Sequence, residues 1–435
     1  MRNYRFLAPI AMIALFGLGV YMIGSGNIKE EAQYRQYLEE ARACASQKIE
    51  IYALQNYQEA IAMRPSLELY MEVAEFYRDV MNDQSKAEQW GETMLENYPR
   101  ESKPYEFQMD ICLRREDPAA FFNLYDQMTG RHVESETAQA MYRSVEYVFY
   151  EQGEYDEMLP FSGNLAPVRR NETWGYCNTK GKKKIGTLYT SVGAFNGGMA
   201  PVTDGDGEAY YIDGDGNKVM AVDGEADIRE LGVMSSAQLY TVYNGDEWSY
   251  YNRAGERLLG GFSAVSTYAN GLAAARSQEG WKIYDTAGNV RPGGPYEDVA
   301  MDEKQMAYRN ERLFVRTDGD YIMIDGEGGR IGADTYEDVK IFYENTYAAV
   351  KKDGKWGFID RDGKWFLEPT YEDARSFLNG FAAVQSDGLW GFINMDRELC
   401  IPCQFTQVRD FTAKGTAPVC RNQTWSVLIL YKDNY

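Results

Sequence analysis

The C-terminal part of the chain, residues 161–435, is a tandem repeat, and this repetition constrains the fold more than any other feature. Each copy has a strand pattern, Ala or Pro followed by any residue and then Val, with an aromatic residue six positions after the Val. Eight copies are present, most of them 33 to 35 residues apart. Such a period predicts one structural unit that is repeated, with each unit burying its apolar face against its neighbours.

The aromatic position is usually tryptophan. We expect these side chains to pack between neighbouring repeats; the alternative is that some face outward and stack on sugar rings or a peptide. The column contains Trp174, Trp248, Trp281, Trp356, Trp390 and Trp425, with Tyr321 in one copy and a displaced Tyr210-Tyr211 in another.

Two further columns predict short strands joined by tight turns. An Asp or Asn four residues after the aromatic residue, usually with Gly three positions later, is typical of a hairpin turn. This pattern occurs at Asn178, Asp213, Asn252, Asp285, Asp325 and Asp360. A second aromatic residue, followed three positions later by Val or Ala, occurs at Tyr189, Phe262, Tyr296, Tyr336, Tyr371 and Phe405.

Each copy therefore holds three or four short β-strands. The copies can stack radially into a β-propeller or linearly into an open β-solenoid. The last copy stops at Tyr435, only two strands into the pattern. A closed ring often divides one blade between the two ends of its chain, so we favour the propeller.

The copies that keep Gly after Trp resemble the WG (KWG) repeat family of bacterial proteins. The matching stretches are Lys355-Trp356-Gly357-Phe358-Ile359-Asp360, Leu389-Trp390-Gly391-Phe392-Ile393-Asn394 and Trp174-Gly175-Tyr176. The middle copies depart from this pattern, because Ser249 and Lys282 replace the Gly and Tyr321 replaces the Trp. The resemblance covers residues 161–435 and implies a binding or structural role, with no common catalytic residue.

Residues 1–27 predict a cytoplasmic tip and a transmembrane signal anchor. Residues 6–23 are 18 consecutive uncharged and mostly apolar positions, which as a helix would match the hydrocarbon thickness of a bilayer. Arg2 and Arg5 precede this run, so the positive-inside rule places the bulk of a single-pass protein outside the cell membrane. A cleaved signal peptide is the alternative, because Gly24 and Gly26 are small enough for a cleavage site.

Residues 28–160 predict a TPR-like helical domain, in which Gly and Pro are sparse and apolar residues recur at helical spacing. Pro65 and Pro99 are 34 residues apart, which is the length of a TPR repeat. Small and aromatic residues precede each proline at TPR-like positions, namely Ala53, Tyr57, Ala60, Val73, Ala74, Tyr77 and Ala87. We interpret Phe149-x-x-x-Gly153-x-Tyr155 as a later TPR-like turn. An irregular helical bundle is the alternative.

Composition argues against most catalytic and metal sites. The net charge of −21 is unsuited to nucleic-acid binding. His132, the single histidine, lies in a polar connection, so we expect no His-based catalytic or metal site. Cys400 and Cys403 form a CxxC, but in a strand-like stretch, so we expect packed thiols or one chance disulfide rather than a redox motif. No catalytic residue, cofactor or metal is therefore predicted.

Calcium and basic motifs are present but have simpler explanations. Asp213, Asp215 and Asn217 match the first, third and fifth positions of a calcium loop, but the later positions do not match, so we favour a hairpin turn. The basic run from Lys180 to Lys184, close in sequence to Arg169-Arg170, is interpreted as a solvated turn. Its alternative is a contact with anionic wall polymer or lipid.

The tripeptide Tyr-Glu-Asp recurs at residues 296–298, 336–338 and 371–373. Paired carboxylates can hydrolyse glycosides, but an active site is normally built once, so we interpret the repetition as charged strand edges that prevent edge-to-edge pairing.

The expected function is that of a membrane-anchored, extracytoplasmic, non-enzymatic binding or scaffolding protein. Its domains would be an anchor at 1–27, a TPR-like domain at 28–160 and a WG-type β-repeat domain at 161–435. The β repeats would present a recognition surface to a protein or to cell-wall glycan. The alternatives are a carboxylate-dependent carbohydrate-active enzyme and an envelope structural or assembly factor.

Overall fold

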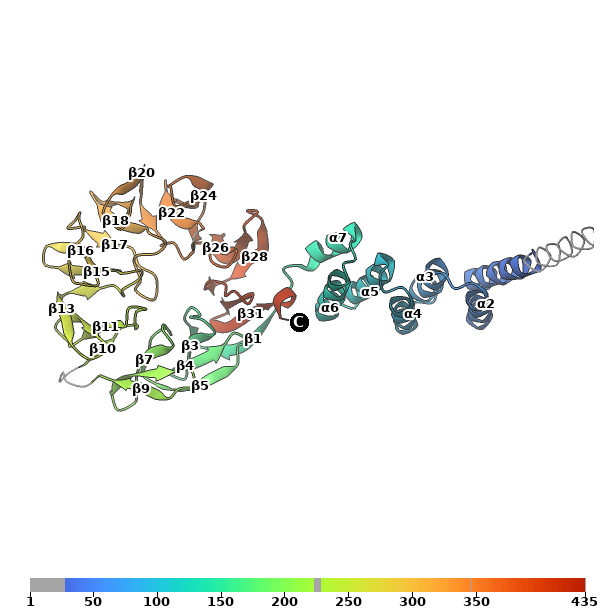
Figure 1. Ribbon diagram of the computed structural model, residues 1–435, viewed down its shortest axis with the longest axis horizontal. Helices are drawn as coiled ribbons and strands as arrows, with labels where there is room; N and C mark the ends of the chain where they lie inside the picture. Colours follow the sequence, from blue (N-terminus) through green and yellow to red (C-terminus); the bar gives the residue numbers. More distant parts are fainter. Residues whose placement is uncertain (1–27, 223–227, 345, 435) are drawn as a thin grey trace, which may run out of the picture. The chain divides into compact units, whose positions relative to one another are not determined.

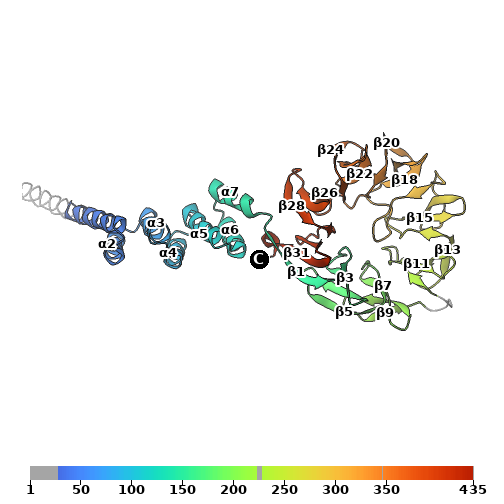
Figure 2. The ribbon, with the colours of Figure 1, turned by 180° about the vertical axis from the view of Figure 1, so that it is seen from behind.

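The computed structural model describes residues 28–222, 228–344 and 346–434. The chain divides into two compact units, one ending at Glu146 and one spanning Tyr147–Asn434. The first is helical and the second is built of β-strands (Figures 1 and 2). The predicted anchor at 6–23 lies outside the described residues. Within those residues, no helix is long and apolar enough to cross a membrane.

The helical unit is a succession of antiparallel helices joined by short turns. Ser66, Asp83, Asp117 and Ser135 each precede a helix and accept a hydrogen bond from its first turn, which satisfies an otherwise free N–H group. The elements are a helix over 28–46, α2 (Glu50–Met63), α3 (Leu67–Glu75) with its π-helical continuation η1 (Phe76–Val80), α4 (Gln84–Asn97), α5 (Ser102–Arg114), α6 (Pro118–Gly130) and α7 (Glu136–Val145).

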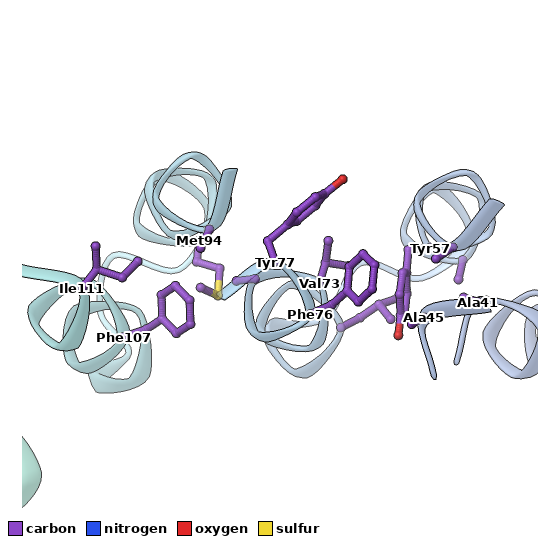
Figure 3. Packing of buried hydrophobic residues seen from close by; sticks show 14 residues of the cluster. Ala41, Ala45, Tyr57, Val73, Phe76, Tyr77, Met94, Phe107 and Ile111 are labelled. Carbon is purple, nitrogen blue, oxygen red and sulfur yellow. The ribbon is translucent and has the colours of Figure 1, made fainter. Parts of the chain in front are cut away.

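Small residues allow the helices to approach closely, and aromatic residues fill the remaining space. Ala53 and Ala60 on α2 are fully buried, and Tyr57 lies between them with 2% of its surface exposed. The Tyr57 hydroxyl donates to a carboxylate oxygen of Glu72 on α3 at 2.8 Å. Figure 3 shows Tyr57 and Val73 within the same run of packed side chains.

The described residues of the second unit form eight small antiparallel sheets, which Figure 1 shows as the blades of a ring. Blade 1 consists of β2 (Glu157–Met158), β3 (Leu165–Arg170), β4 (Thr173–Asn178) and β5 (Lys183–Tyr189), and blade 2 of β6 (Ser191–Val192), β7 (Met199–Thr203), β8 (Ala209–Asp213) and β9 (Lys218–Ala221). Blade 3 consists of β10 (Glu230–Leu231), β11 (Leu239–Tyr243), β12 (Trp248–Asn252) and β13 (Arg257–Phe262), and blade 4 of β14 (Ala264–Val265), β15 (Leu272–Ser277) and β16 (Gly280–Asp285).

The remaining blades continue around the ring. Blade 5 consists of β17 (Asp298–Val299), β18 (Leu313–Thr317), β19 (Asp320–Ile324) and β20 (Arg330–Tyr336), and blade 6 of β21 (Asp338–Val339), β22 (Ala348–Lys352), β23 (Lys355–Ile359) and β24 (Trp365–Tyr371). Blade 7 consists of β25 (Asp373–Ala374), β26 (Phe381–Ser386), β27 (Leu389–Asn394) and β28 (Leu399–Phe405), and blade 8 of β29 (Gln407–Val408), β30 (Thr416–Arg421), β31 (Thr424–Leu430) and β1 (Phe149–Tyr155). A short 3₁₀ helix, η2 (Tyr431–Asp433), follows.

The ring is closed by strands from the two ends of this unit. β1 pairs antiparallel with β31, so the first strand completes the last blade. This confirms the propeller and excludes the open solenoid. It also corrects the interpretation of Phe149-x-x-x-Gly153-x-Tyr155: this segment is a β-strand with an irregularity between Gln152 and Tyr155, not a helical turn. The bulge accommodates Gly153, whose φ of +90° suits glycine.

The predicted turns are present between the third and fourth strands and, in the three-stranded blade 4, directly after the third strand. In each, one side-chain oxygen accepts from the backbone N–H groups two and four residues further on, as in Asp360 with Asp362 and Lys364 at 2.9 Å each. The same pattern occurs at Asn178, Asp213, Asn252, Asp285, Asp325 and Asn394.

Side chains also connect one blade to the next. After its innermost strand, a blade presents a polar side chain that donates to a backbone carbonyl of the following blade. Asn379 donates to Phe411 at 2.7 Å, Asn196 to Met234 at 2.7 Å, Thr346 to Phe377 at 3.3 Å, and Ser162 to Phe195.

Candidate functional site

The centre of the propeller is bounded by eight equivalent positions, here called the inner ring. Each directly follows the first, two-residue strand of a blade, and its N–H donates to a carbonyl of the second strand at 2.7 to 3.0 Å. Since the fourth strands lie at the outer rim in Figure 1, these positions are innermost. The inner ring comprises Leu159, Gly193, Gly232, Ser266, Ala300, Lys340, Arg375 and Arg409.

The inner ring is chemically asymmetric. Five consecutive blades contribute small or apolar residues, and the last three contribute Lys340, Arg375 and Arg409. The Lys340 ammonium lies 5.0 Å from the ring centre of Trp356, and the Arg409 guanidinium lies 4.5 Å from that of Trp425. These cation–π contacts hold both basic groups against the tryptophans of their own blades.

Arg375 is the centre of a buried ion network. Its Nε and Nη2 donate to the two carboxylate oxygens of Asp410 at 2.7 Å each, and Nη2 also lies 2.6 Å from Glu303. The Tyr343 hydroxyl donates to Glu303 at 3.4 Å. Burial by itself would lower the pKa of Arg375, but Asp410, Tyr343 and Glu303 together outweigh burial and raise it, so the guanidinium stays charged.

A turn from blade 5, Asp302–Met306, reaches into the ring and contacts three other blades; it is here called the central turn. Asp302 Oδ1 accepts from the N–H groups of Lys304 and Met306 at 2.9 Å each. The Gln305 carbonyl accepts from the N–H of Thr267 in blade 4 at 2.7 Å. Lys304 Nζ donates to Ser162 Oγ in blade 1 at 3.1 Å.

Because the central turn touches blades 1, 4 and 7, it lies across the ring rather than along one blade. Burial raises the pKa of Asp302, and burial lowers the pKa of Lys304. Both shifts express the cost of holding a charge where water is largely excluded.

Two hollows border the central turn. One, of about 160 Å³, is lined by small and apolar residues of blades 1 to 3, including Gly193, Pro201 and Gly232, and by Glu303–Gln305. The other, of about 370 Å³, is lined by the central turn, Tyr343, Asn379 and residues 410–413. Concave sites with an apolar wall and a few polar groups are where proteins usually bind ligands.

The tryptophan column does not converge on this centre. Each of its members lies in an apolar cluster that includes residues of the next blade, as Trp356 does with Phe377 and Trp425 does with Met158. Trp281, Trp356 and Trp425 are buried, whereas Trp174, Trp248 and Trp390 are partly exposed. In six blades the aromatic column residue pairs across strands with the second aromatic column, as Trp390 does with Phe405.

A steric constraint explains why glycine follows Trp in several blades. A Cβ atom at Gly357 would lie 2.6 Å from the Leu367 carbonyl oxygen, at Gly391 2.5 Å from that of Ile401, and at Gly175 2.5 Å from that of Gly186. The fourth strand therefore crosses directly over the glycine. In blade 3, where Ser249 replaces the glycine, its cross-strand partner is Gly260. In this blade the facing position lacks a side chain instead.

The repeated Tyr-Glu-Asp motifs stabilise turns. Glu297, Glu337 and Glu372 accept from the backbone N–H groups of Gly319, Gly354 and Gly388, in the hairpins of their own blades. Their carboxylates are thus distributed around the ring and are not paired at one site. The three glutamates are exposed directly before the first, edge strand of each blade, as the interpretation as charged strand edges expects, and each of them also holds a turn.

The remaining polar motifs lie apart from the centre. Asp213 holds its own hairpin turn, and Asn217 donates to it at 3.0 Å. His132 is exposed after α6. Cys400 and Cys403 are in strand β28, away from any helix start, and burial raises the pKa of Cys403. Within the part of the chain that the structure describes, no three His, Cys, Asp or Glu side chains are grouped to hold a metal ion.

The basic run at 180–184 does not join the two arginines that precede it in the sequence. Arg169 and Arg170 lie at one end of β3, while Lys183 begins β5 beyond the opposite end of β4. Arg169 is 3.0 Å from Glu157, and Lys184 is 2.8 Å from Asp215. Adjacency in the sequence was therefore misleading.

The central turn was missed by sequence reasoning. The sequence does mark this turn. It lies in the longest connection between a first and a second strand, from β17 (Asp298–Val299) to β18 (Leu313–Thr317), and this connection carries three charged residues in succession, Asp302–Lys304. The three basic residues of the inner ring were also detectable from the sequence, because each directly follows the first strand of its blade: Lys340 after β21, Arg375 after β25 and Arg409 after β29.

Comparison with known proteins agrees with the repeat architecture. The model of the WG containing repeat matches residues 152–174, 174–206, 329–356, 356–390 and 390–425. A search of curated proteins gives no match. BamB from Moraxella catarrhalis matches with 12% identity and a TM-score of 0.43, over 65% of this chain and 100% of that one. Hsv2p of Kluyveromyces lactis matches with 12% identity and a TM-score of 0.37, over 57% and 96%.

The five matched stretches fall in blades 1, 2 and 5 to 8 and in the closing strand β1. Blades 3 and 4, where Ser249 and Lys282 stand in place of the glycine, are not matched. The C-terminal region of this chain therefore contains WG repeats.

Proposed function

We propose that this chain is a membrane-anchored, extracytoplasmic, non-enzymatic binding or scaffolding protein. Its propeller presents a recognition surface to a protein or to cell-wall glycan. The observation that carries this proposal is the centre of the closed ring, where two hollows flank the central turn and no equivalent feature recurs in every blade. The apolar run at 6–23, preceded by Arg2 and Arg5, supports the anchor.

The helical unit would be a TPR-like spacer and recruiting platform. The positions named from the TPR pattern, among them Ala53, Tyr57 and Ala74, are buried between helices. This supports a stacked arrangement in which each helix packs on its sequence neighbours.

The recognition surface is tested by site-specific photo-crosslinking in living cells. A crosslinking residue at Ala413, exposed beside the 370 Å³ hollow, is compared with one at Leu258, exposed on the outer strand β13. We expect one defined envelope component to be captured from Ala413 only. Equal capture from both positions, or none from Ala413, would contradict the proposal.

Two further arms separate the ligand classes and test the location. Co-sedimentation of the 28–435 fragment with purified cell-wall glycan tests the glycan, and the crosslinked product identifies a protein. Protease added to intact cells should degrade the propeller if the bulk of the chain is extracytoplasmic. Protection until the cells are lysed would contradict the anchor orientation.

A further inference from the structure

The larger of the two hollows at the propeller centre is built from one kind of connection. Its volume is about 370 Å³, within the range of about 300–1,000 Å³ that small-molecule sites have. Every residue that lines it lies between the first and the second strand of blade 1, 5, 6, 7 or 8. Five blades therefore contribute equivalent loops on one face of the propeller, and these loops meet around a single hollow.

The charges around this hollow nearly balance. Its lining carries four carboxylates and two cations, namely Asp302, Glu303, Glu344, Asp410, Lys304 and Arg309. A further cation, Arg375, is bonded to two of these carboxylates, on Glu303 and Asp410. An added anion would therefore face several carboxylates, and an added cation would face several basic groups. The balance favours an uncharged ligand.

An uncharged ligand would find both a donor and an acceptor in this hollow. The Arg309 side chain is 28% exposed, and its Nη2 lies 3.0 Å from the Met306 sulfur and 3.6 Å from Asp302. Among the described residues, its Nη1 has no acceptor. The Glu303 side chain is 39% exposed, and its Oε2 accepts a long bond of 3.4 Å from Tyr343. Hydroxyl groups suit this pair, because each can accept from a guanidinium and donate to a carboxylate.

One wall of the hollow is apolar. It includes Pro160, Phe161 and Leu378. Pro160 and Leu378 are partly exposed, and Phe161 keeps 9% of its surface exposed. An apolar wall beside a few hydrogen-bonding groups matches a sugar ring, whose C–H groups pack on apolar side chains while its hydroxyls form hydrogen bonds.

The backbone beside the hollow is already hydrogen-bonded. Leu378 and Phe381 exchange two backbone bonds, at 2.9 and 3.2 Å, and the Thr412 N–H donates to the Thr416 carbonyl at 2.8 Å. These two connections therefore offer no free strand edge to which an extended peptide could add. Recognition by side chains favours a sugar unit over a peptide strand.

We propose that this hollow binds one unit of an uncharged glycan, with sugar hydroxyls bonded to Arg309 and Glu303 and the ring against Phe161 and Leu378. This inference rests on the proposed function and narrows it, because it selects glycan rather than protein as the ligand of the propeller centre. The four residues come from blades 1, 5 and 7, so the site exists only in the closed ring.

The test uses the full chain, solubilised in a detergent that carries no sugar, and titrates trisaccharides by calorimetry. The neutral probes are trimers of glucose, mannose, galactose and N-acetylglucosamine. The charged probes are trimers of glucosamine, which is cationic, and of galacturonic acid, which is anionic. We expect at least one neutral probe to bind more tightly than either charged probe. Its affinity should change by less than about twofold as salt is raised, because no ion pair forms.

Two variants test whether the sugar occupies this hollow. Arg309→Lys keeps the charge but loses the guanidinium fork, so it should weaken binding about tenfold. Ala413→Trp fills the hollow from an exposed position and should abolish binding. Arg316→Lys in β18 and Leu258→Trp in β13 are the matched controls outside the hollow, and both should keep wild-type affinity. Melting temperatures of all variants are compared so that a fold defect is recognised.

The inference is overturned if no neutral probe binds at millimolar concentration, if a charged probe binds more tightly than every neutral one, or if Ala413→Trp binds like wild type. Its failure is distinguishable from failure of the proposed function. If Ala413 crosslinks to a defined protein and no trisaccharide binds, the proposed function stands and the glycan inference fails. If nothing is captured from Ala413, the proposed function itself is contradicted.

Discussion

Trp425 of β31 is paired across strands with Tyr155 of β1, 270 residues earlier in the chain. Tyr155 thus occupies in blade 8 the place that Phe405 occupies opposite Trp390 in blade 7. It is buried, and its hydroxyl donates to the Gly181 carbonyl of blade 1 at 3.0 Å. One side chain therefore completes the last blade and attaches it to the first.

Replacing Tyr155 by Ala should open the ring locally. The loss of a buried aromatic side chain is expected to lower the free energy of unfolding by about 3–5 kcal/mol. Tyr371→Ala removes the aromatic residue opposite Trp356 in blade 6, away from the closure, and is the matched control. Hydrogen exchange should become fast along β31 only in Tyr155→Ala. Equal exchange in both variants would show that β1 does not hold the ring closed.

Adding a methyl group at Gly391 should destabilise the propeller. The Cβ of Gly391→Ala would meet backbone atoms of Ile401 and Cys403 at 2.5 and 2.7 Å, so the fourth strand must shift. We expect a loss of about 1–3 kcal/mol in denaturant unfolding. Gly186→Ala is the control, because its Cβ would meet only the Leu188 side chain at 3.5 Å. Similar losses in both variants would contradict the steric argument.

Replacing Gln423 by Gly should stabilise the protein. Asn422 and Gln423 form a hairpin turn with φ of +48° and +68°, where blades 5, 6 and 7 have Asp-Gly. Glycine adopts this conformation without strain, so Gln423→Gly should raise stability by about 0.5–1 kcal/mol. The reciprocal change Gly388→Gln, at φ +73°, should lower it by a similar amount. A melting temperature that moves in the same direction in both variants would refute this.

Asp302 should make stability depend on pH. Its folded-state pKa is raised by burial, so above that pKa its charge costs more in the folded than in the unfolded state. At pH 7 Asp302→Asn should therefore be more stable than wild type. The difference should shrink as pH falls through the raised pKa and vanish below about 4, where Asp becomes protonated in both states. Denaturant melts of both proteins between pH 4 and 7 measure it, and a difference that grows with acidity would be contrary to expectation.

The sequence predicted those features that repeat. Eight registered copies allow the turns, the strand order and the packing of the tryptophans between blades to be inferred, because the same residue recurs wherever the same contact does. Features that occur once were missed. Tyr155 was assigned to the helices because it is separated from the other copies of its column, although Tyr155-x-x-Met158 has the spacing of Tyr371-x-x-Ala374.

The central turn could not be inferred for a related reason. Its contacts with Ser162 and Thr267 join residues from three different blades, and no local pattern encodes such a meeting. For the basic run at 180–184, the sequence was misleading in the opposite way, because it suggested a proximity that the fold does not have. It lies next to Arg169-Arg170 in the sequence but is separated from them by the length of β4.

The position of β1 also has a mechanical consequence. This strand follows the helical unit directly, so any tension applied to the N-terminal side of the chain reaches the ring first through the five residues of β1 that are paired with β31. A propeller held at a surface through its N-terminal side would therefore be tethered by the strand that keeps it closed.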